Sequence, residues 1–371
     1  MTSLPDIEER YVINVGPQHP STHGGIHVEA LMEGEIIVDS KVHLGYVHRS
    51  VEKIAEKRTY MQYMPYPARF DYVATNLPVT GYCQAVEKLL GLEIPERAEY
   101  LRVIMCELSR IASHLLFIAS LAIDIGATTG LLYCFRDRER VLDMFEMTSG
   151  QRLLSSYVRI GGVSSDLPQS FYSAVESFLE DVPKMIKEYH GLLTGNEIFQ
   201  ARLCNVGTLS LETAKAYGVS GPNLRASGLA YDIRRADPYS IYDRFDFDIP
   251  VSEDGDGMAR YLLRVREIEE SAKIIRQALA GLPHGDFKSG KVPKNIKPKA
   301  GMEAYHRIES SKGELGFYIV SDGSEHPYRL HVRAPSFINL MVLPVITHDT
   351  PLQNLITNIA TLDPVLGEAD R

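Results

Sequence analysis

Apolar and polar residues alternate along the first part of the chain, which predicts strands. The alternation covers residues 11–15 and 26–31, and it continues in 36–38 beyond a Glu33-Gly34 turn. Alternation places successive side chains on opposite faces of a sheet. Two such runs around a short glycine-containing turn predict a β-hairpin. We therefore expect a small sheet near the start of the chain.

From about Arg49 onward, apolar residues recur at intervals of three and four, which predicts helices. The longest run follows Pro95, a residue that helices accept in their first turn. Strand patterns return after residue 300. The expected helices are 97–122, 138–146, 170–193, 211–217, 257–279 and 354–361, and the expected late strands are 303–308, 316–320 and 328–333.

A helical middle with strands at both ends predicts an α+β fold. We divide the chain into an N-terminal β subdomain (1–47), a helical bundle (48–281) and a C-terminal part (282–371). The C-terminal part begins with a connector, residues 282–299, that is rich in Lys, Pro and Gly and is expected to be exposed. A β-hairpin and a tail follow it.

One apolar stretch, residues 115–135, is long enough to cross a membrane. Its single charge, Asp124, lies near its middle, where a charge is costly in a bilayer. Gly126 and Gly130 indicate a break between two helices. We therefore favour a buried core helix that ends in a loop over a membrane span.

Composition narrows the classes of function. The formal net charge of −9 and the absence of a basic run argue against nucleic acid as a partner. The first residues show neither the basic nor the apolar region of a signal peptide. The cysteines are too far apart for CxxC pairs, so we expect reduced thiols rather than disulfides or a zinc site. They are Cys83, Cys106, Cys134 and Cys204.

Residues 16–25 (GPQHPSTHGG) carry the most distinctive candidate chemistry. His19 and His23 would share a helix face, but the prolines and the paired glycines predict a loop instead. Imidazoles titrate near neutral pH, so this loop would handle protons or contact a ligand. Alternatively, it is a tight turn whose histidines only bond to the backbone. Without a helix and a glutamate between them, the two histidines do not match a zinc motif.

Two more titratable residues lie among apolar neighbours. Tyr72 is predicted at the start of a helix, and Asp124 at the end of one. Tyr72 could equally be a buried tyrosine with a single hydrogen bond, and Asp124 a cap or an ion-pair partner. Arg49 and Arg69 are candidates for holding a negative charge. Dinucleotide-binding, P-loop and nucleophile-elbow motifs are absent from the sequence.

Several motifs in a fixed order resemble one known family over nearly the whole chain. The chain resembles the D subunit of respiratory complex I (NADH:quinone oxidoreductase) and its archaeal counterpart in deazaflavin-dependent dehydrogenases. That family is related to the large subunits of nickel–iron hydrogenases. The matching segments are 16–24 (GPQHPSTHG), 107–115 (ELSRIASHL), 224–228 (LRASG), 313–316 (GELG), 333–337 (RAPSF) and 362–364 (LDP).

The resemblance implies a hydrogenase-large-subunit-like fold without its nickel. The two CxxC pairs of the hydrogenases would fall near residues 69–74 and 363–368, and neither stretch contains cysteine. Thiolates are the ligands that such a soft-metal site requires. We therefore expect no metal ligands there and no cofactor bound by this chain itself.

The resemblance also implies roles for the candidate residues. His23 and Tyr72 would contact the two carbonyl oxygens of a quinone-type acceptor, with Asp124 behind His23 and His19 in the same loop. Reduction of a quinone takes two protons, so donors are needed at both ends of the ring. Arg49 and Arg69 would lie near a 4Fe–4S cluster of a partner protein and raise its potential. Alternatively, these arginines pair with Asp71 or Glu52.

One position departs from the family. Many relatives carry histidine where this chain has Leu154. A leucine cannot titrate, so we predict a cluster potential that is low and nearly independent of pH. Such a potential suits menaquinone or methanophenazine better than ubiquinone.

The expected function is that of a core subunit in the peripheral arm of an ion-pumping oxidoreductase, on the cytoplasmic side of the cell membrane. The implied partners are a cluster-bearing B-type subunit, a C-type subunit, an I-type ferredoxin-like subunit and an H-type membrane subunit. Two alternatives remain at this point. One is a hydrogenase-type catalytic subunit, which the missing CxxC pairs disfavour, and the other is a non-catalytic scaffold.

Overall fold

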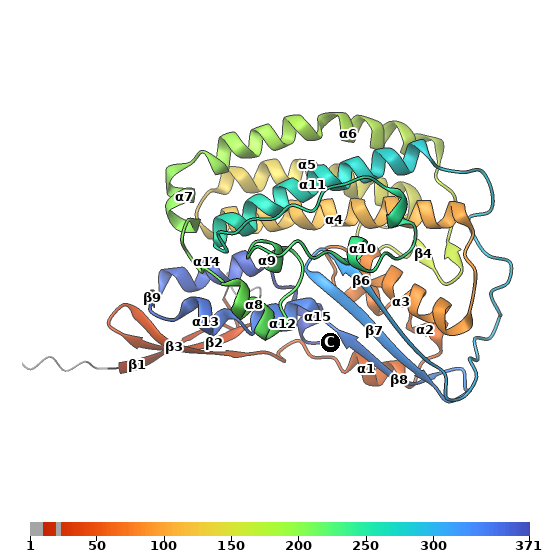
Figure 1. Cartoon of the computed structure of the whole chain (residues 1–371), viewed down its shortest axis with the longest axis horizontal. Coiled ribbons are helices and arrows are strands. Elements are labelled where there is room, and N and C mark those ends of the chain that lie inside the picture. Colours follow the sequence, from red (N-terminus) through yellow and green to blue (C-terminus); the bar gives the residue numbers. More distant parts are fainter. Residues whose placement is uncertain (1–9, 20–23) are drawn as a thin grey trace, which may run out of the picture.

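A computed structural model describes residues 10–19 and 24–371, and it shows a layer of long helices above the two larger sheets (Figure 1). This arrangement confirms the α+β prediction. The strands are β1 (Arg10–Val15), β2 (His27–Glu33), β3 (Ile36–His43), β4 (Val158–Arg159), β5 (Gly162–Val163), β6 (Glu303–Ser310), β7 (Gly313–Ser321), β8 (Pro327–Arg333) and β9 (Thr350–Pro351).

The helices account for most of the remaining chain. In order they are α1 (Val51–Ala55), α2 (Tyr60–Tyr63), η2 (Pro67–Arg69), α3 (Asn76–Leu90), α4 (Glu96–Asp124), α5 (Thr128–Ser149), α6 (Gln169–Tyr189), η3 (His190–Thr194), α7 (Glu197–Leu203), α8 (Leu211–Tyr217), α9 (Pro222–Arg225), α10 (Ile233–Ala236), η4 (Tyr242–Arg244), α11 (Gly257–Ala280), α12 (Pro335–Leu340), α13 (Leu343–Thr347), α14 (Gln353–Leu362) and α15 (Leu366–Ala369).

The N-terminal sheet has the antiparallel order β1-β2-β3-β9 and contains the predicted hairpin. Its register pairs Val15 with Val28 and His27 with His43. Side chains alternate along β2, so that Val28 and Ala30 are fully buried while His27 and Glu29 point to the other face. The buried face packs against α13–α15 and forms a small core of its own.

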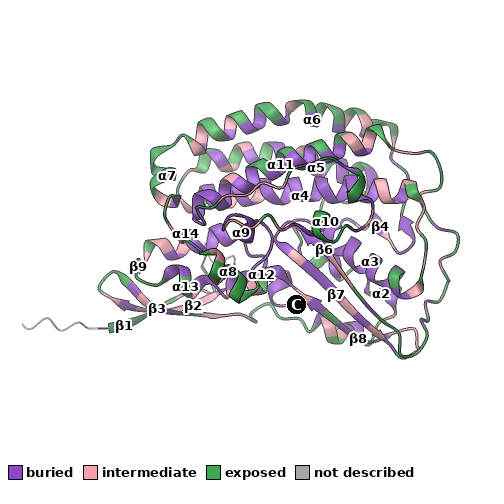
Figure 2. Ribbon diagram, in the orientation of Figure 1, coloured by how far each residue is buried: buried purple, intermediate pink, exposed green. Residues whose placement is uncertain are grey.

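The helix α4 runs through the main core, with α5, α11 and α3 packed around it. It is long and apolar enough to cross a membrane, yet 89% of its most apolar 18-residue stretch is buried inside the protein. The prediction of a buried core helix is confirmed, and so is its end at Asp124. Figure 2 shows the same burial as nearly continuous purple along α4.

The helix α5 begins at Thr128, ten residues before the sequence pattern predicted a helix. Gly126, with φ of 91°, ends α4, as expected of a helix-terminating glycine. Gly130 instead lies inside α5, where a side-chain carbon would come within 3.1 Å of Ala122 Cβ. The glycine therefore allows α4 and α5 to approach, a tertiary cause that periodicity does not reveal.

Charged side chains fill part of the main core. Glu107 of α4 accepts hydrogen bonds from Arg110, Arg234, Tyr242 and Ser271, and all five residues are buried. Nearby, the Arg225 guanidinium lies 2.7 Å from carboxylate oxygens of Glu267 and Glu309. A buried charge is tolerated only when it is paired and hydrogen-bonded. This network therefore ties α4 to α9, α10, α11 and β6.

The C-terminal sheet, β6-β7-β8, packs against α3. Residues 282–299 connect α11 to it along the outside of the molecule, mostly exposed as predicted. After β8 the chain returns through α12–α15 to the N-terminal sheet. There the Asp370 carboxylate accepts hydrogen bonds from the backbone amides of Gly45 (2.8 Å) and Val47 (3.0 Å).

Candidate functional site

Two segments far apart in the sequence meet where the two cores adjoin. A side-chain carbon at position 367 would lie 2.6 Å from the Arg69 carbonyl oxygen and 2.7 Å from that of Phe70. The side chain of the preceding Leu366 lies against Gly25, which follows the histidine-bearing loop. The segments 69–74 and 363–368, singled out by the resemblance, are therefore neighbours.

Tyr72 lies in the turn between η2 and α3, so the prediction that it starts a helix is wrong. The Asp71 carboxylate accepts hydrogen bonds from the amides of Val73 and Ala74, both at 3.2 Å. A short acidic side chain bonded in this way stabilises a turn in place of a helix. The turn leaves Tyr72 43% exposed, at the rim of the junction.

The surroundings of Tyr72 are charged, which corrects the expectation of an apolar environment. Partial burial raises the pKa of Tyr72, and the acidic side chains of Asp71, Glu368 and Asp363 raise it further. At neutral pH the hydroxyl therefore keeps its proton and can donate a hydrogen bond.

A buried polar cluster lies behind Tyr72, in the junction. The Lys312 ammonium contacts Asp363 at 2.5 Å and Ser113 at 3.0 Å. Arg264 Nε lies 3.3 Å from the same Asp363 oxygen. Asp71 accepts a 3.0 Å hydrogen bond from Ser311, beside Lys312. Two cations, Lys312 and Arg264, and two acidic side chains, Asp363 and Asp71, thus share the floor of the junction.

Glu368 is the last member of this cluster, and its carboxyl group binds a proton. It accepts hydrogen bonds from the amide and hydroxyl of Ser336. Its other oxygen, Oε2, is buried and has no hydrogen-bond partner among the described residues. Burial, followed by the nearby Asp71, raises the pKa of Glu368 to about 8, and burial likewise raises the pKa of Asp71. The Glu368 carboxyl is therefore mainly protonated at neutral pH.

Sequence reasoning did not select this cluster. Three of its members, Asp71, Asp363 and Glu368, lie inside the two segments that it compared with the hydrogenase cysteines. The sequence therefore did contain a signal for this cluster, namely carboxylates in the segments where the hydrogenases carry thiolates. Lys312 carried no such signal, because only the fold brings it to the junction.

The donor set at this junction does not fit a nickel–thiolate site. Its side chains are carboxylates, hydroxyls, one ammonium and one guanidinium. Cys83 and Cys106 are buried within α3 and α4, and Cys134 within α5. Soft metals require thiolates, and the segments 69–74 and 363–368 offer none.

Arg49 and Arg69 are neighbours on the exposed rim next to Tyr72. Arg49 donates to the Arg69 carbonyl oxygen (3.1 Å), and Arg69 donates to that of Pro65 (2.6 Å). Within residues 10–19 and 24–371, neither arginine pairs with Asp71 or Glu52, so that alternative is wrong. Glu52 instead pairs with other residues, namely Arg329, His331 and Arg371.

A cavity of about 380 Å³ opens beside Arg69. Leu154 and Arg159 contribute to its wall, so Leu154 faces the same space as Arg69. Leu154 has a φ of 55°, a left-handed conformation that is unusual for leucine.

The remaining predicted residues lie elsewhere or cannot be placed. His23 falls outside the described residues. His19 is exposed and lines a different cavity, of about 790 Å³, between the N-terminal sheet and residues 351–356. Asp124 is half-buried at the end of α4. The structure thus brings Tyr72, Arg49 and Arg69 together, but not His19 with them.

Comparisons with known proteins agree on one family. Residues 124–371 match the family described as "Respiratory-chain NADH dehydrogenase, 49 Kd subunit". The chain is 52% identical to the D subunit of NADH-quinone oxidoreductase from Clostridium beijerinckii and 53% identical to that from Desulfitobacterium hafniense, each over 98% of both chains. It is 48% identical to the corresponding protein of Bacillus cereus, over 98% of this chain and 99% of the relative.

Proposed function

Because this chain belongs to the 49 kDa, or D, subunit family of respiratory NADH dehydrogenases, we propose that it forms the site where a quinone-type acceptor is reduced. As a member of that family it is a subunit of an oxidoreductase complex. One observation carries the proposal: the exposed Tyr72 lies against Gly367, beside a buried cluster in which Glu368 holds a proton.

The chemistry of quinone reduction fits this arrangement. Two electrons and two protons convert a quinone to a quinol, so each carbonyl oxygen needs a donor. Tyr72 serves one oxygen, because its raised pKa keeps the phenol protonated. His23 serves the other, with Asp124 behind it. The contact of Leu366 with Gly25 and of Gly367 with the Tyr72 segment supports this pairing, since one short helix touches both sides of the site.

Electrons reach the acceptor from a 4Fe–4S cluster of the B-type partner, at the cavity that Arg69 and Leu154 line. The positive charge of Arg49 and Arg69 favours the reduced, more negative cluster and raises its potential. Leu154 supplies no titratable group. A low, pH-independent potential matches menaquinone or methanophenazine as the acceptor.

The other partners follow from the same role. The C-type and I-type subunits complete the peripheral arm, and the H-type subunit admits the acceptor's tail from the membrane. The chain then lies on the cytoplasmic side of a membrane-bound, ion-pumping complex.

Replacement of Tyr72 by phenylalanine in the assembled complex tests the proposal. The ring stays and the donor is lost, so acceptor reduction should fall more than about tenfold, the loss expected when one transition-state hydrogen bond is removed. Assembly and the cluster's spectrum should be unchanged. Tyr328→Phe is the matched control, because Tyr328 is a 67% exposed tyrosine on β8.

Unchanged turnover of Tyr72→Phe would refute the assignment and favour a non-catalytic scaffold. Stoichiometric nickel in the purified complex would instead favour the hydrogenase-type alternative. Binding of a headgroup-analogue inhibitor that is lost on replacement of His23 would exclude the scaffold.

A further inference from the structure

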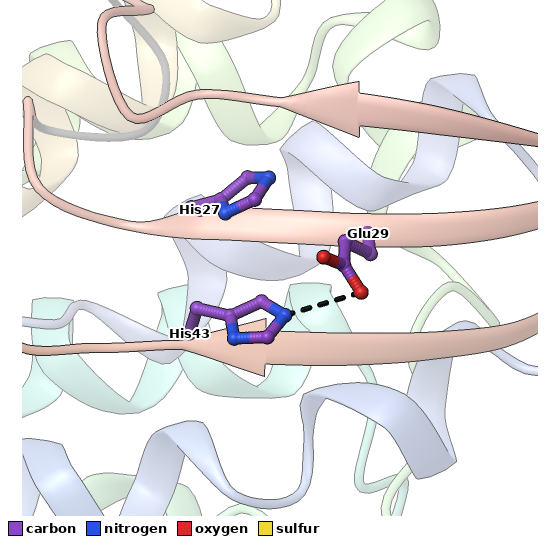
Figure 3. A group of neighbouring side chains, drawn as sticks. All are labelled: His27, Glu29 and His43. Atoms are coloured by element: carbon purple, nitrogen blue, oxygen red, sulfur yellow. Dashed lines mark ion pairs between the residues drawn. The ribbon is translucent and has the colours of Figure 1, made fainter.

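The outer face of the N-terminal sheet carries two histidines and a glutamate side by side (Figure 3). His27 of β2 lies directly opposite His43 of β3 in the register, and Glu29 follows two residues later on the same face as His27. This face is opposite to the one that Val28 and Ala30 bury in the core. All three residues are half-buried, and among the described residues the buried Nε2 atom of His43 has no hydrogen-bond partner.

The three side chains are close enough to share one ligand. Their candidate donor atoms all lie within 4.8 Å of one another, and His43 Nε2 is 3.2 Å from Glu29 Oε2. The two imidazole rings are stacked, with centroids 5.1 Å apart. In the described part of the chain, no other group of three His, Cys, Asp or Glu side chains has this geometry.

We propose that His27, Glu29 and His43 bind a divalent transition-metal ion of the zinc class. Two imidazoles and one carboxylate form a common three-ligand set for zinc, with water in the fourth position. An oxygen-seeking ion such as Mg²⁺ does not favour two imidazoles. The close approach of His43 lowers the pKa of Glu29, and the ionised carboxylate is the form that binds a metal.

The required movement is small. Around a zinc ion with bonds of about 2.0–2.1 Å, donor atoms lie about 3.3 Å apart. Only outward-facing side chains must turn to close the present separation, and the strands need not shift. The site is therefore built on a rigid backbone whose register already sets the spacing.

The neighbours of His27 fit the surroundings of a metal-binding histidine. One ring nitrogen lies 3.1 Å from the Tyr46 hydroxyl, and the other lies 2.9 Å from Asn14 Oδ1. The second nitrogen of a ligating imidazole usually donates a hydrogen bond from its N–H to an oxygen, which fixes the orientation of the ring. Tyr46 can perform that task while the nitrogen near Asn14 turns to the metal.

The site also has a defined position in the molecule. His27 comes two residues after Gly25, at the foot of the loop that contains His19 and His23. An ion bound to both β2 and β3 would link the end of this loop to β3, the strand that leads into Gly45 and Val47. Asp370 already holds those two amides.

Titration of the full-length chain with Zn²⁺, followed by calorimetry, and with Co²⁺, followed by visible absorption, tests the inference. We expect one equivalent to bind, with the intense visible bands of tetrahedral cobalt. The variants His27→Gln, Glu29→Gln and His43→Gln should each weaken binding more than roughly tenfold, since even the loss of a residue that only orients a ligand costs ~10–100-fold.

His331→Gln is the matched control. His331 is a half-exposed histidine on β8 that pairs with Glu52 at 3.1 Å, without a third ligand. Its replacement should leave the binding constant unchanged.

Absence of saturable binding, or binding that survives all three ligand variants, would show that the group is a cross-strand ion pair only. An equal loss in His331→Gln would show unspecific binding to imidazoles and overturn the proposal too. Circular dichroism of each variant reports its folding. Should a variant misfold, the wild-type cobalt spectrum decides, because a tetrahedral site is excluded when its bands are missing.

Discussion

The backbone of Gly367 lies against the ring of Tyr72: a side-chain carbon at position 367 would be 3.3 Å from Tyr72 Cδ1. The same carbon would also collide with two carbonyl oxygens of the preceding turn, at 2.6 and 2.7 Å. Backbone atoms cannot move aside as a flexible side chain can. The position of Tyr72 therefore depends on the absence of a side chain at 367.

Gly367→Ala should accordingly displace Tyr72. We expect the free energy of unfolding to fall by about 1–3 kcal/mol, as for other overpacked sites, and acceptor reduction by the complex to fall with it. Thermal unfolding and turnover measure the two effects. Gly191→Ala is the control, because nothing lies within 4 Å of the added carbon there. If Gly367→Ala matches Gly191→Ala in both assays, the contact does not position Tyr72.

Glu368 should make the protein less stable as the pH rises. Its pKa is raised from the ordinary 4.5 to about 8 in the folded protein. Between these two values the folded state binds one proton more than the unfolded state, so the free energy of unfolding falls with increasing pH. Above pH 8 both states are ionised at this position, and the loss is complete.

Glu368→Gln removes this effect while keeping an acceptor for Ser336. We expect the variant to be more stable than the wild type at pH 8.5, and nearly equal to it at pH 5. Melting temperatures at both pH values measure the difference. Glu253→Gln, at an exposed carboxylate, should leave the pH profile unchanged. Parallel profiles for Glu368→Gln and the wild type would contradict a protonated Glu368.

Glu107 should be essential for stability. Its removal leaves the buried Arg110 without its ion-pair partner and leaves the buried Arg234 with Asp232 alone. We expect Glu107→Ala to cost about 3–5 kcal/mol of unfolding free energy in denaturant titrations, the range for a broken buried ion pair. Glu139→Ala, which breaks an exposed pair with Arg152, should cost less than about 1 kcal/mol. If Glu107→Ala loses as little unfolding free energy as Glu139→Ala, the buried network does not stabilise the fold.

Leu154→His should make the cluster potential depend on pH. An imidazole beside the cluster would gain a proton when the cluster is reduced, with a limiting slope of about 59 mV per pH unit for one electron and one proton. Histidine adopts positive φ more readily than leucine, so the backbone at 154 tolerates it. Redox titrations of the complex at pH 6 and 8, monitored by electron paramagnetic resonance, measure the slope.

Two further proteins complete that experiment. The wild type should give the same potential at both pH values. Leu132→His, at a 67% exposed leucine on α5, should behave like the wild type. A clear slope in the wild type would contradict the role assigned to Leu154.

Local patterns predicted most of the fold. The bounds of α8 agree with the sequence pattern at both ends, those of α11 differ by one residue at one end, and those of α14 differ by one residue at each end. Errors arose where tertiary contacts decide the conformation. The sequence predicted a loop at Gly130, but there the close contact with Ala122 lets two helices approach. It predicted a helix at Tyr72, but there the Asp71 side chain accepts hydrogen bonds from the backbone amides and forms a turn.

The candidate site divides in the same way. Single residues with distinctive chemistry, such as Tyr72 and Arg69, could be selected from the sequence. The cluster behind Tyr72 could not, because Lys312 and Glu368 become neighbours of Asp71 only when the C-terminal segment folds back. Likewise, His27 and His43 are sixteen positions apart, and only the register of β2 and β3 pairs them.

The position of Glu309 decides whether the helical part can exist alone. This glutamate belongs to β6, yet its carboxylate neutralises Arg225, and its carbonyl oxygen accepts a hydrogen bond from Arg110. A fragment ending at residue 281 would leave both guanidinium groups inside an apolar interior with partners missing. Dissection of the molecule there should yield an insoluble product, so the bundle and the C-terminal sheet must be expressed and studied as one piece.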